Sequence, residues 1–286
     1  MCLIKNRFLQ VGFMLACMIC IIGVMATAIY YVNAPGSSCL VVKTGSPWFL
    51  QAPEVLNAYI LYPRDDNEEK FNDAADERVA YLTFDDGPSE NTPVVLDILE
   101  EYEAVATFFV NGVDIPFGHK MYRRMVKEGH ALGNHTYSHK YSQIYQSTES
   151  FFEDLLQLEL LLKKVIGKTP RVMRFPGGST NTVSRSVSGY NIMEELIVKV
   201  EKAGYIYHDW NVCAFDSDFP PPNEATITQN VLQQARFREG DIVVLLHDGM
   251  MNKTTPGALP KIIEGLREMG FHFEVITPEV ERVQFY

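Results

Sequence analysis

The chain has 286 residues, of which 47% are hydrophobic and 21% are charged, and its formal net charge is -11. This length and composition are typical of a globular protein with one large α/β domain or two small ones, and they exclude a disordered chain. The acidic balance argues against nucleic-acid binding, which requires a basic face.

The N-terminal segment has the pattern of a membrane anchor. Lys5 and Arg7 precede an uncharged stretch whose most apolar part is Val11–Val32. A helix of about 22 residues spans about 33 Å, enough to cross a hydrocarbon core of about 30 Å. The positive-inside rule then predicts that residues 1–7 form a cytoplasmic tail, that residues 8–32 cross the cell membrane once, and that the rest of the chain is extracellular.

Two alternatives remain for this segment. Ala26-Thr27-Ala28 resembles a small-residue cleavage site, so residues 8–32 also fit a signal peptide whose removal leaves a secreted protein. A lipid-modified Cys17 is the third hypothesis. All three export the bulk of the chain.

The next segment, residues 33–76, is predicted to be an extracellular stem or linker. It contains several prolines and an acidic run that begins at Asp65, which is typical of a solvated linker. Cys2, Cys17 and Cys20 lie in or beside the apolar N-terminal segment, which leaves only Cys39 and Cys213, so no disulfide framework is expected.

From residue 77 onward, strand-like and helix-like segments alternate. Strands are predicted at about 79–82, 106–110, 171–175, 205–212, 241–246 and 271–276. Helices are predicted from 91–93 onward and at about 119–128, 147–166, 190–203, 227–237 and 258–269. This alternation predicts one domain, 77–286, with a parallel sheet wrapped by helices, either open or closed into a barrel.

Two adjacent carboxylates, Asp85 and Asp86, follow the apolar strand 79–82 within the sequence Thr-Phe-Asp-Asp-Gly-Pro. Carboxylates at the end of a buried strand are unfavourable unless a metal ion or proton chemistry compensates them. The carboxyl ends of parallel strands also form the ligand crevice of open α/β sheets and barrels. An isolated Asp-Asp-Gly-Pro is more typical of a surface turn, so the remaining motifs decide.

The second motif contains His135 and His139, four residues apart. Histidines at this spacing are often solvated or capping residues. Together with a strand-end carboxylate, however, they complete the His-His-Asp ligand set of an open catalytic zinc site. The carboxylate that is not on the metal is then free to act as a general base.

Two further segments end predicted strands. Arg174 precedes Pro176-Gly177-Gly178, and an arginine there can hold the basic carboxylate in its ionised form while the turn exposes N–H groups to an oxyanion. His247 follows four aliphatic residues, which suits either a packed histidine or a proton donor to a leaving group. The other histidines, at 119, 130, 208 and 272, are expected to be packing or surface residues, and Tyr137 a wall of the site or part of the core.

These segments, together with a fifth one, His208–Asp216, resemble in their order the polysaccharide deacetylase family, which is carbohydrate esterase family 4 with its NodB-homology domain. The resemblance runs from about residue 77 to 282. It implies a distorted (β/α) barrel and metal-dependent removal of acetyl groups from acetylated polysaccharides.

The resemblance also implies a role for each matching residue. Asp85 corresponds to the catalytic base, and Asp86, His135 and His139 correspond to the metal ligands. Arg174 would hold the base, and the Gly177 N–H would donate to the oxyanion. His247 would be the general acid, and Asp216 would orient it and raise its pKa.

One segment departs from the family pattern. Many members have Asp and Trp where this chain has Cys213 and Ser217. Because Asp216 keeps its position, an active enzyme is still expected, and the missing Trp affects substrate fit more than chemistry.

The expected substrate is an acetylated cell-wall polysaccharide, and peptidoglycan N-acetylglucosamine is the first choice for an anchored extracellular deacetylase. Chitin oligomers, poly-N-acetylglucosamine and acetyl-xylan are alternatives, as is a catalytically silent, membrane-tethered glycan-binding protein. The expected cofactor is a divalent metal ion, zinc first, with cobalt, nickel or manganese as alternatives. No protein partner is inferred.

Overall fold

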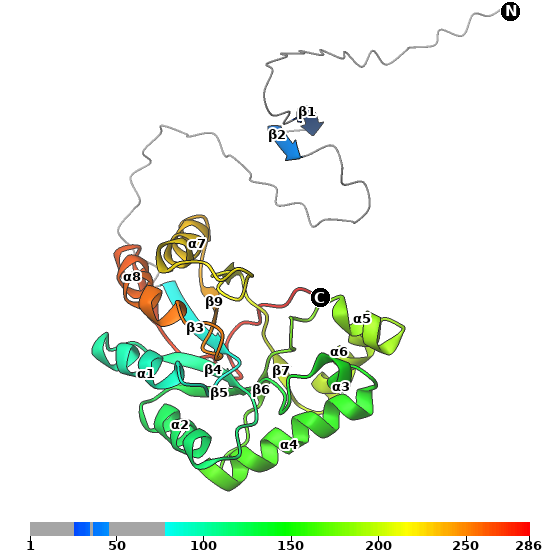
Figure 1. The fold of residues 1–286 in the computed structure, drawn as a ribbon, viewed down its shortest axis with the longest axis vertical. Coiled ribbons are helices and arrows are strands. Elements are labelled where there is room, and N and C mark those ends of the chain that lie inside the picture. The colour runs from blue at the N-terminus through cyan, green and yellow to red at the C-terminus, as the bar shows by residue number, and fades with distance from the viewer. Residues whose placement is uncertain (1–25, 35–36, 46–77) are drawn as a thin grey trace, which may run out of the picture. The chain divides into compact units, whose positions relative to one another are not determined.

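The computed structural model describes residues 26–34, 37–45 and 78–286 (Figure 1). The first two ranges form an antiparallel pair, β1 (Ala26–Ala34) and β2 (Ser37–Gly45), in which Ala26 lies opposite Gly45. This pair and the domain from residue 78 onward are separate units.

The expected transmembrane helix over 8–32 is wrong for its last residues, because 26–32 lie in strand β1. The run Ile29-Tyr30-Tyr31-Val32 is β-branched and aromatic, a composition that favours an extended backbone. The earlier part of the expected span and most of the expected stem lie outside the described residues. Within the described ranges, no helix is both long enough and apolar enough to cross a membrane.

The domain is built on one parallel sheet, which confirms the predicted alternation of strands and helices. Its strands are β3 (Arg78–Asp85), β4 (Ala106–Val110), β5 (Ala131–Asn134), β6 (Val172–Met173), β7 (Ile206–Tyr207), β8 (Val212–Cys213), β9 (Ile242–His247) and β10 (Phe271–Phe273). Their order is β7-β6-β5-β4-β3-β9-β8, and β10 pairs with the beginning of β3. The central strand β3 therefore has β4 on one side and β9 on the other.

Helices cover the outside of this curled sheet (Figure 1). They are α1 (Thr92–Glu101), α2 (Pro116–Lys127), α3 (Tyr141–Ile144), α4 (Thr148–Ile166), α5 (Val183–Ser188), α6 (Ile192–Lys202), α7 (Glu224–Arg236) and α8 (Thr255–Glu268). Ser147 caps α4 by accepting the Ser150 N–H, and Gly167 ends it in the left-handed conformation, as its position after the amphipathic run predicts.

The strand expected over 205–212 is two short strands, β7 and β8, at the two ends of the sheet order. His208 still donates its N–H to Met173 of β6, whereas Asn211 donates to Val243 of β9. Residues 208–211 thus carry the chain from one end of the sheet to the other, and the expected barrel is curled and incomplete.

The two faces of β3 have different surroundings, as the two-residue period of a strand requires. Ala80, Leu82 and Phe84 pack in the large core that includes residues of the outer helices. Val79 and Tyr81 belong to a smaller inner cluster with residues of β4, β6 and β9. Since Asp85 has the same parity as Val79 and Tyr81, its side chain lies on the inner face, at the carboxyl end of the strand.

Candidate active site

A buried ion pair forms the floor of the site. Arg174 is fully buried, and its Nη1 donates to Asp85 Oδ1 at 2.9 Å and to Thr83 Oγ1 at 2.7 Å. Its Nε and Nη2 donate to the carbonyl oxygens of His208 and Asp209 at 2.9 and 2.8 Å. A buried arginine with a carboxylate partner and satisfied donors is stable and rigid, so Asp85 is held in one orientation.

Burial dominates the electrostatics of Asp85. It raises the pKa of this carboxyl, while the positive charge of Arg174 and, to a smaller extent, that of His247 oppose the rise. A carboxylate whose pKa lies nearer to neutrality is a more effective general base than an ordinary surface aspartate.

Three potential metal ligands converge beside Asp85. One ligand atom from each of Asp86, His135 and His139 lies within 4.8 Å of the others. Asp86 Oδ1 is 3.5 Å from His135 Nε2 and 3.2 Å from His139 Nε2. His135 Nδ1 lies 2.8 Å from the Arg174 carbonyl oxygen, and donating its proton there leaves Nε2 as the free ligand atom.

The residues fit a divalent cation. Asp86 Oδ1 is buried and has no hydrogen-bond donor in the described part of the chain, although buried carboxylate oxygens normally have one. Burial, together with the nearby His139, lowers the pKa of His135 to about 3, so its ring is neutral, as a metal ligand must be. Asp86 and His139 also have positive φ angles of 75° and 53°, a strained conformation that clusters at functional sites.

The loop between the two histidines is fixed from outside the site. Asp154 on α4 is buried, and its Oδ1 accepts the N–H groups of Tyr137 and Ser138 at 2.6 and 2.9 Å. Tyr137 packs against the large core, so of its two expected places the core is the one observed.

His247 stands on β9 directly opposite Asp85 of β3 in the strand register. Asp216 accepts the His247 N–H through Oδ2 at 2.8 Å and lies 2.8 Å from Nδ1 through Oδ1. Thr255 Oγ1 also donates to Asp216 Oδ2. Burial alone would lower the pKa of His247, but the hydrogen bond and charge of Asp216, with the nearby Asp85 and Asp86, raise it to about 9.

Gly177 is an exposed residue of its turn, and its N–H has no acceptor within the described residues. Gly177 has a φ of 78°, and a Cβ there would lie 2.7 Å from the Tyr141 hydroxyl. The Tyr141 ring also packs edge-on against His139 at 5.4 Å. Sequence reasoning missed Tyr141; its only signal was an aromatic residue two positions after the second histidine. Burial raises its pKa to about 12, so it is a neutral phenol.

Asp248, the residue after His247, was also missed. Its fully buried side chain accepts the Thr92 hydroxyl through Oδ2, while Oδ1 has no partner in the described part of the chain. A Cβ on Gly87 would lie 2.4 Å from Oδ1, so the carboxyl packs directly on the turn after Asp86. Burial, with the charges of Asp86 and Asp85, raises the pKa of Asp248 to about 7.

The two residues that depart from the family pattern lie differently from each other. Cys213 is half-buried, its Sγ accepts the Phe215 N–H at 3.4 Å, and burial raises the pKa of the thiol to about 12. Gln234 of α7 bonds both backbone groups of Cys213. Cys213 therefore adds no charge to the site, and Ser217 is exposed on the following turn.

The remaining histidines lie outside the metal-binding group. His119 is 2.6 Å from Asp114, and His272 is 3.2 Å from Glu274. His130 and His208 are buried.

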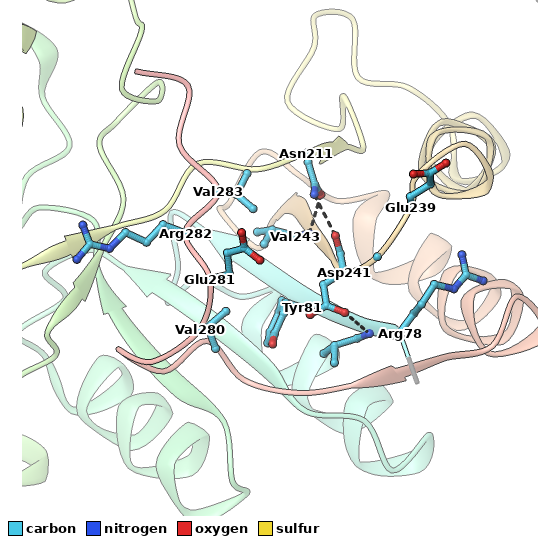
Figure 2. A pocket seen from close by; sticks show the side chains of 12 residues that line it. Arg78, Tyr81, Asn211, Glu239, Asp241, Val243, Val280, Glu281, Arg282 and Val283 are labelled. Carbon is cyan, nitrogen blue, oxygen red and sulfur yellow. Dashed lines mark hydrogen bonds between the residues drawn. The ribbon is translucent and has the colours of Figure 1, made fainter. Parts of the chain in front are cut away.

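A cavity of about 550 Å³ lies at the amino ends of the strands, opposite the edge that carries the site. It is bounded by the beginnings of β3 and β9 and by Val280–Val283 of the C-terminal segment (Figure 2). Tyr81, which lines it, precedes Asp85 by four residues, or about 13 Å of strand. The cavity is therefore separate from the group of carboxylates and imidazoles.

The carboxyl ends of this curled parallel sheet bring together a possible metal site, a buried carboxylate and a histidine paired with an aspartate, which are the groups that a metal-dependent hydrolase requires. The model of the family described as polysaccharide deacetylase matches residues 72–192. A peptidoglycan-N-acetylglucosamine deacetylase of Bacillus cereus is 33% identical over 214 residues, 73% of each chain. A second B. cereus protein of that name is 34% identical over 203 residues, 70% of this chain and 87% of that one. The chain belongs to the polysaccharide deacetylase family, as the five segments predicted.

Solved structures agree with this assignment. The catalytic domain of peptidoglycan N-acetylglucosamine deacetylase from Eubacterium rectale is 36% identical, with a TM-score of 0.69 over 73% of this chain and 93% of that one. The polysaccharide deacetylase Bc1974 from B. cereus has a TM-score of 0.64 at 31% identity.

Proposed function

We propose that this chain hydrolyses the acetamide of N-acetylglucosamine residues in peptidoglycan and releases acetate. The observation that carries the proposal is the convergence of Asp86, His135 and His139 beside Asp85, which pairs with His247 in the strand register. The similarity to enzymes named peptidoglycan-N-acetylglucosamine deacetylases supports the choice of substrate.

Asp86, His135 and His139 are the proposed ligands of a divalent ion, zinc first, since two imidazoles and one carboxylate form an open zinc site. Such an ion polarises a bound carbonyl and makes water more acidic. The buried, unpartnered Asp86 Oδ1 supports this assignment, because a cation would satisfy it.

The protein's own groups then perform the proton transfers. Asp85, oriented by Arg174, takes a proton from the attacking water as the new carbon–oxygen bond forms. The Gly177 N–H donates to the developing oxyanion. His247, protonated and braced by Asp216, gives its proton to the sugar nitrogen as the carbon–nitrogen bond breaks. Acetate and a free amine result.

The test is acetate release from purified peptidoglycan, chitin oligomers and acetyl-xylan, assayed side by side with the wild-type chain and Asp85→Asn. Release from peptidoglycan with the fastest turnover, and its loss in the variant, supports the proposal. Faster release from chitin oligomers or acetyl-xylan transfers the assignment to that substrate. Glycan binding with no acetate released from any of the three, at full metal occupancy, would replace it with a silent binding protein.

The domain boundaries and the location of the protein also remain proposals. The apolar pattern that begins at residue 8, after Lys5 and Arg7, supports a single-pass anchor with the domain 77–286 outside the cell. Membrane fractionation and the intact mass of the mature chain distinguish an anchor from a cleaved signal peptide. If the intact mass shows that the mature chain begins near residue 29, and the protein is found in the medium, the anchor is excluded.

A further inference from the structure

The buried carboxylate of Asp209 has no role in the reaction described above, yet it is among the best-coordinated acids of the domain. Its side chain is fully buried and accepts the Ser179 N–H at 2.8 Å, the Ser179 hydroxyl at 2.6 Å and the Phe285 N–H at 2.9 Å. A buried carboxylate is tolerated when several donors satisfy it, and such charge-assisted bonds are short and directional. Asp209 therefore fixes both of the segments that supply these donors.

One of those segments carries the Gly177 N–H. Gly177 and Gly178 both have positive φ angles, 78° and 82°. Because glycine adopts positive and negative φ with similar ease, the two residues do not by themselves fix the conformation of the turn. The Gly178 N–H closes the turn on Phe175, and the next residue, Ser179, is bound twice by Asp209. Through its two bonds to Ser179, Asp209 thus fixes the chain immediately after these two glycines.

The other segment is the end of the chain. Asp209 donates its own N–H to the Val283 carbonyl at 2.7 Å, and the Phe285 N–H returns to Asp209 Oδ2. The Phe285 ring packs edge-on against Trp210 at 5.0 Å. Residues 283–285 therefore lie alongside residues 207–210, and Val283 also borders the cavity in Figure 2.

The same residue also contacts the support of the catalytic base, because the Asp209 carbonyl accepts Arg174 Nη2 at 2.8 Å. One backbone position thus joins the arginine that holds Asp85, the turn that carries Gly177 and the C-terminal segment. We infer that Asp209 is a positioning residue for deacetylation, which fixes the Gly177 turn, and that the backbone groups of Val283 and Phe285 hold Asp209 in place. This inference rests on the proposed function.

If the role of Asp209 were purely structural, replacing it would lower only the stability of the fold. If Asp209 is a positioning residue, replacing it also slows the chemical step in the folded protein. An oxyanion donor contributes about 10²- to 10³-fold in kcat, and a displaced donor loses part of that. For Asp209→Asn, which places an amide where an acceptor is needed, we expect kcat to fall about 10- to 100-fold. KM should change less than threefold, and metal content should equal that of the wild type.

A matched pair tests the tail without altering Asp209. Phe285→Ala loses the ring but keeps the N–H, whereas Phe285→Pro also loses the N–H that Asp209 accepts. We expect Phe285→Pro to have a kcat about tenfold lower than Phe285→Ala at similar KM. Gln284→Ala is the control, because the Gln284 side chain bonds Tyr207 and does not touch Asp209, so its kcat should equal that of the wild type.

The deciding experiment measures kcat, KM, metal content and melting temperature for these variants on the best substrate of the wild type. Lower kcat in Asp209→Asn and in Phe285→Pro, at unchanged KM and metal content, supports the inference. Equal kcat for Phe285→Pro and Phe285→Ala, or a folded Asp209→Asn with wild-type kcat, overturns it while the proposed function stands. If Asp209→Asn does not fold, the Phe285 pair decides alone. A wild-type chain that releases no acetate overturns the proposed function itself.

Discussion

Asp85 and His247 occupy paired positions on the neighbouring parallel strands β3 and β9. Each has its own buried partner, Arg174 for the carboxylate and Asp216 for the imidazole. Burial raises the pKa of Asp85 by more than Arg174 lowers it, so the carboxyl is a weaker acid than usual. Burial lowers the pKa of His247, but Asp216 and the nearby carboxylates raise it further, so the imidazole is a stronger base than usual. Two neighbouring groups with pKa values displaced in this way suit the roles of proton acceptor and proton donor at the same pH.

Replacing Asp85 with Asn should abolish the proton acceptor while leaving the fold intact. The amide oxygen can still accept from Arg174, so the expected result is a loss of about 10²- to 10⁴-fold in kcat with a small change in melting temperature. Acetate release from the preferred substrate measures it. Asp97→Asn, which removes an exposed carboxylate paired with Arg124, is the control and should keep full activity. Near-normal turnover of Asp85→Asn at full metal occupancy would remove Asp85 from its role.

The alkaline limit of activity should report the protonation of His247. A general acid acts only while protonated, so the rate falls as pH rises through its pKa, which the structure places at about 9. Asp216→Asn removes the group that raises this pKa, so the alkaline limb of kcat against pH should move to lower pH, toward the ordinary histidine value of about 6.5. A profile that moves upward, or one that is identical in the two proteins, would contradict the pairing of Asp216 with His247.

Gly177→Ala should impair both stability and catalysis. Its φ of 78° strains an L-residue by about 1–2 kcal/mol, and its Cβ would lie 2.7 Å from the Tyr141 hydroxyl, displacing the turn. Gly189→Ala is the matched control, since Gly189 has a φ of 82° with no atom within 4 Å of a Cβ. Both variants should therefore lose stability in denaturant unfolding, but only Gly177→Ala should lose at least tenfold in kcat. Equal activity of the two variants would remove Gly177 from the site.

Cys213→Ser should be nearly neutral, although the resemblance to the family led us to expect an aspartate at this position. The thiol sulfur accepts the Phe215 N–H two residues further along the chain, and burial raises the pKa of the thiol to about 12. The thiol is therefore neither charged nor reactive at pH 8. We expect kcat within about twofold of the wild type and slow alkylation of the peptide that contains Cys213, measured by mass spectrometry. Rapid alkylation that inactivates the enzyme would show an ionised thiol at the site instead.

The sequence indicated the residues that now lie together at the site, because each belongs to a short motif and several of these motifs end an apolar strand. Asp85, His247 and Arg174 have this position, and the parallel sheet brings such ends to one edge. The strand β5 was not predicted, since it has four residues that include a glycine. The split of 205–212 was missed because residues 208–211 cross between the ends of the sheet.

Two of the buried acids that support the site, Asp154 and Asp209, could not be predicted. Asp154 precedes no motif, and its partners Tyr137 and Ser138 are 17 and 16 residues away. Asp209 binds Phe285, which is 76 residues further along the chain. Such contacts exist only after folding, whereas a motif is visible in one short segment.

The central claim is that Asp86, His135 and His139 bind one divalent cation while Asp85 stays free of it. The most direct test is the metal content of purified, dialysed protein for the wild type, Asp85→Asn and His139→Ala, measured by elemental analysis after each is reloaded with zinc. The account predicts about one zinc per chain for the wild type and for Asp85→Asn, and a content at least tenfold lower for His139→Ala. Loss of zinc in Asp85→Asn, or full zinc in His139→Ala, would contradict it.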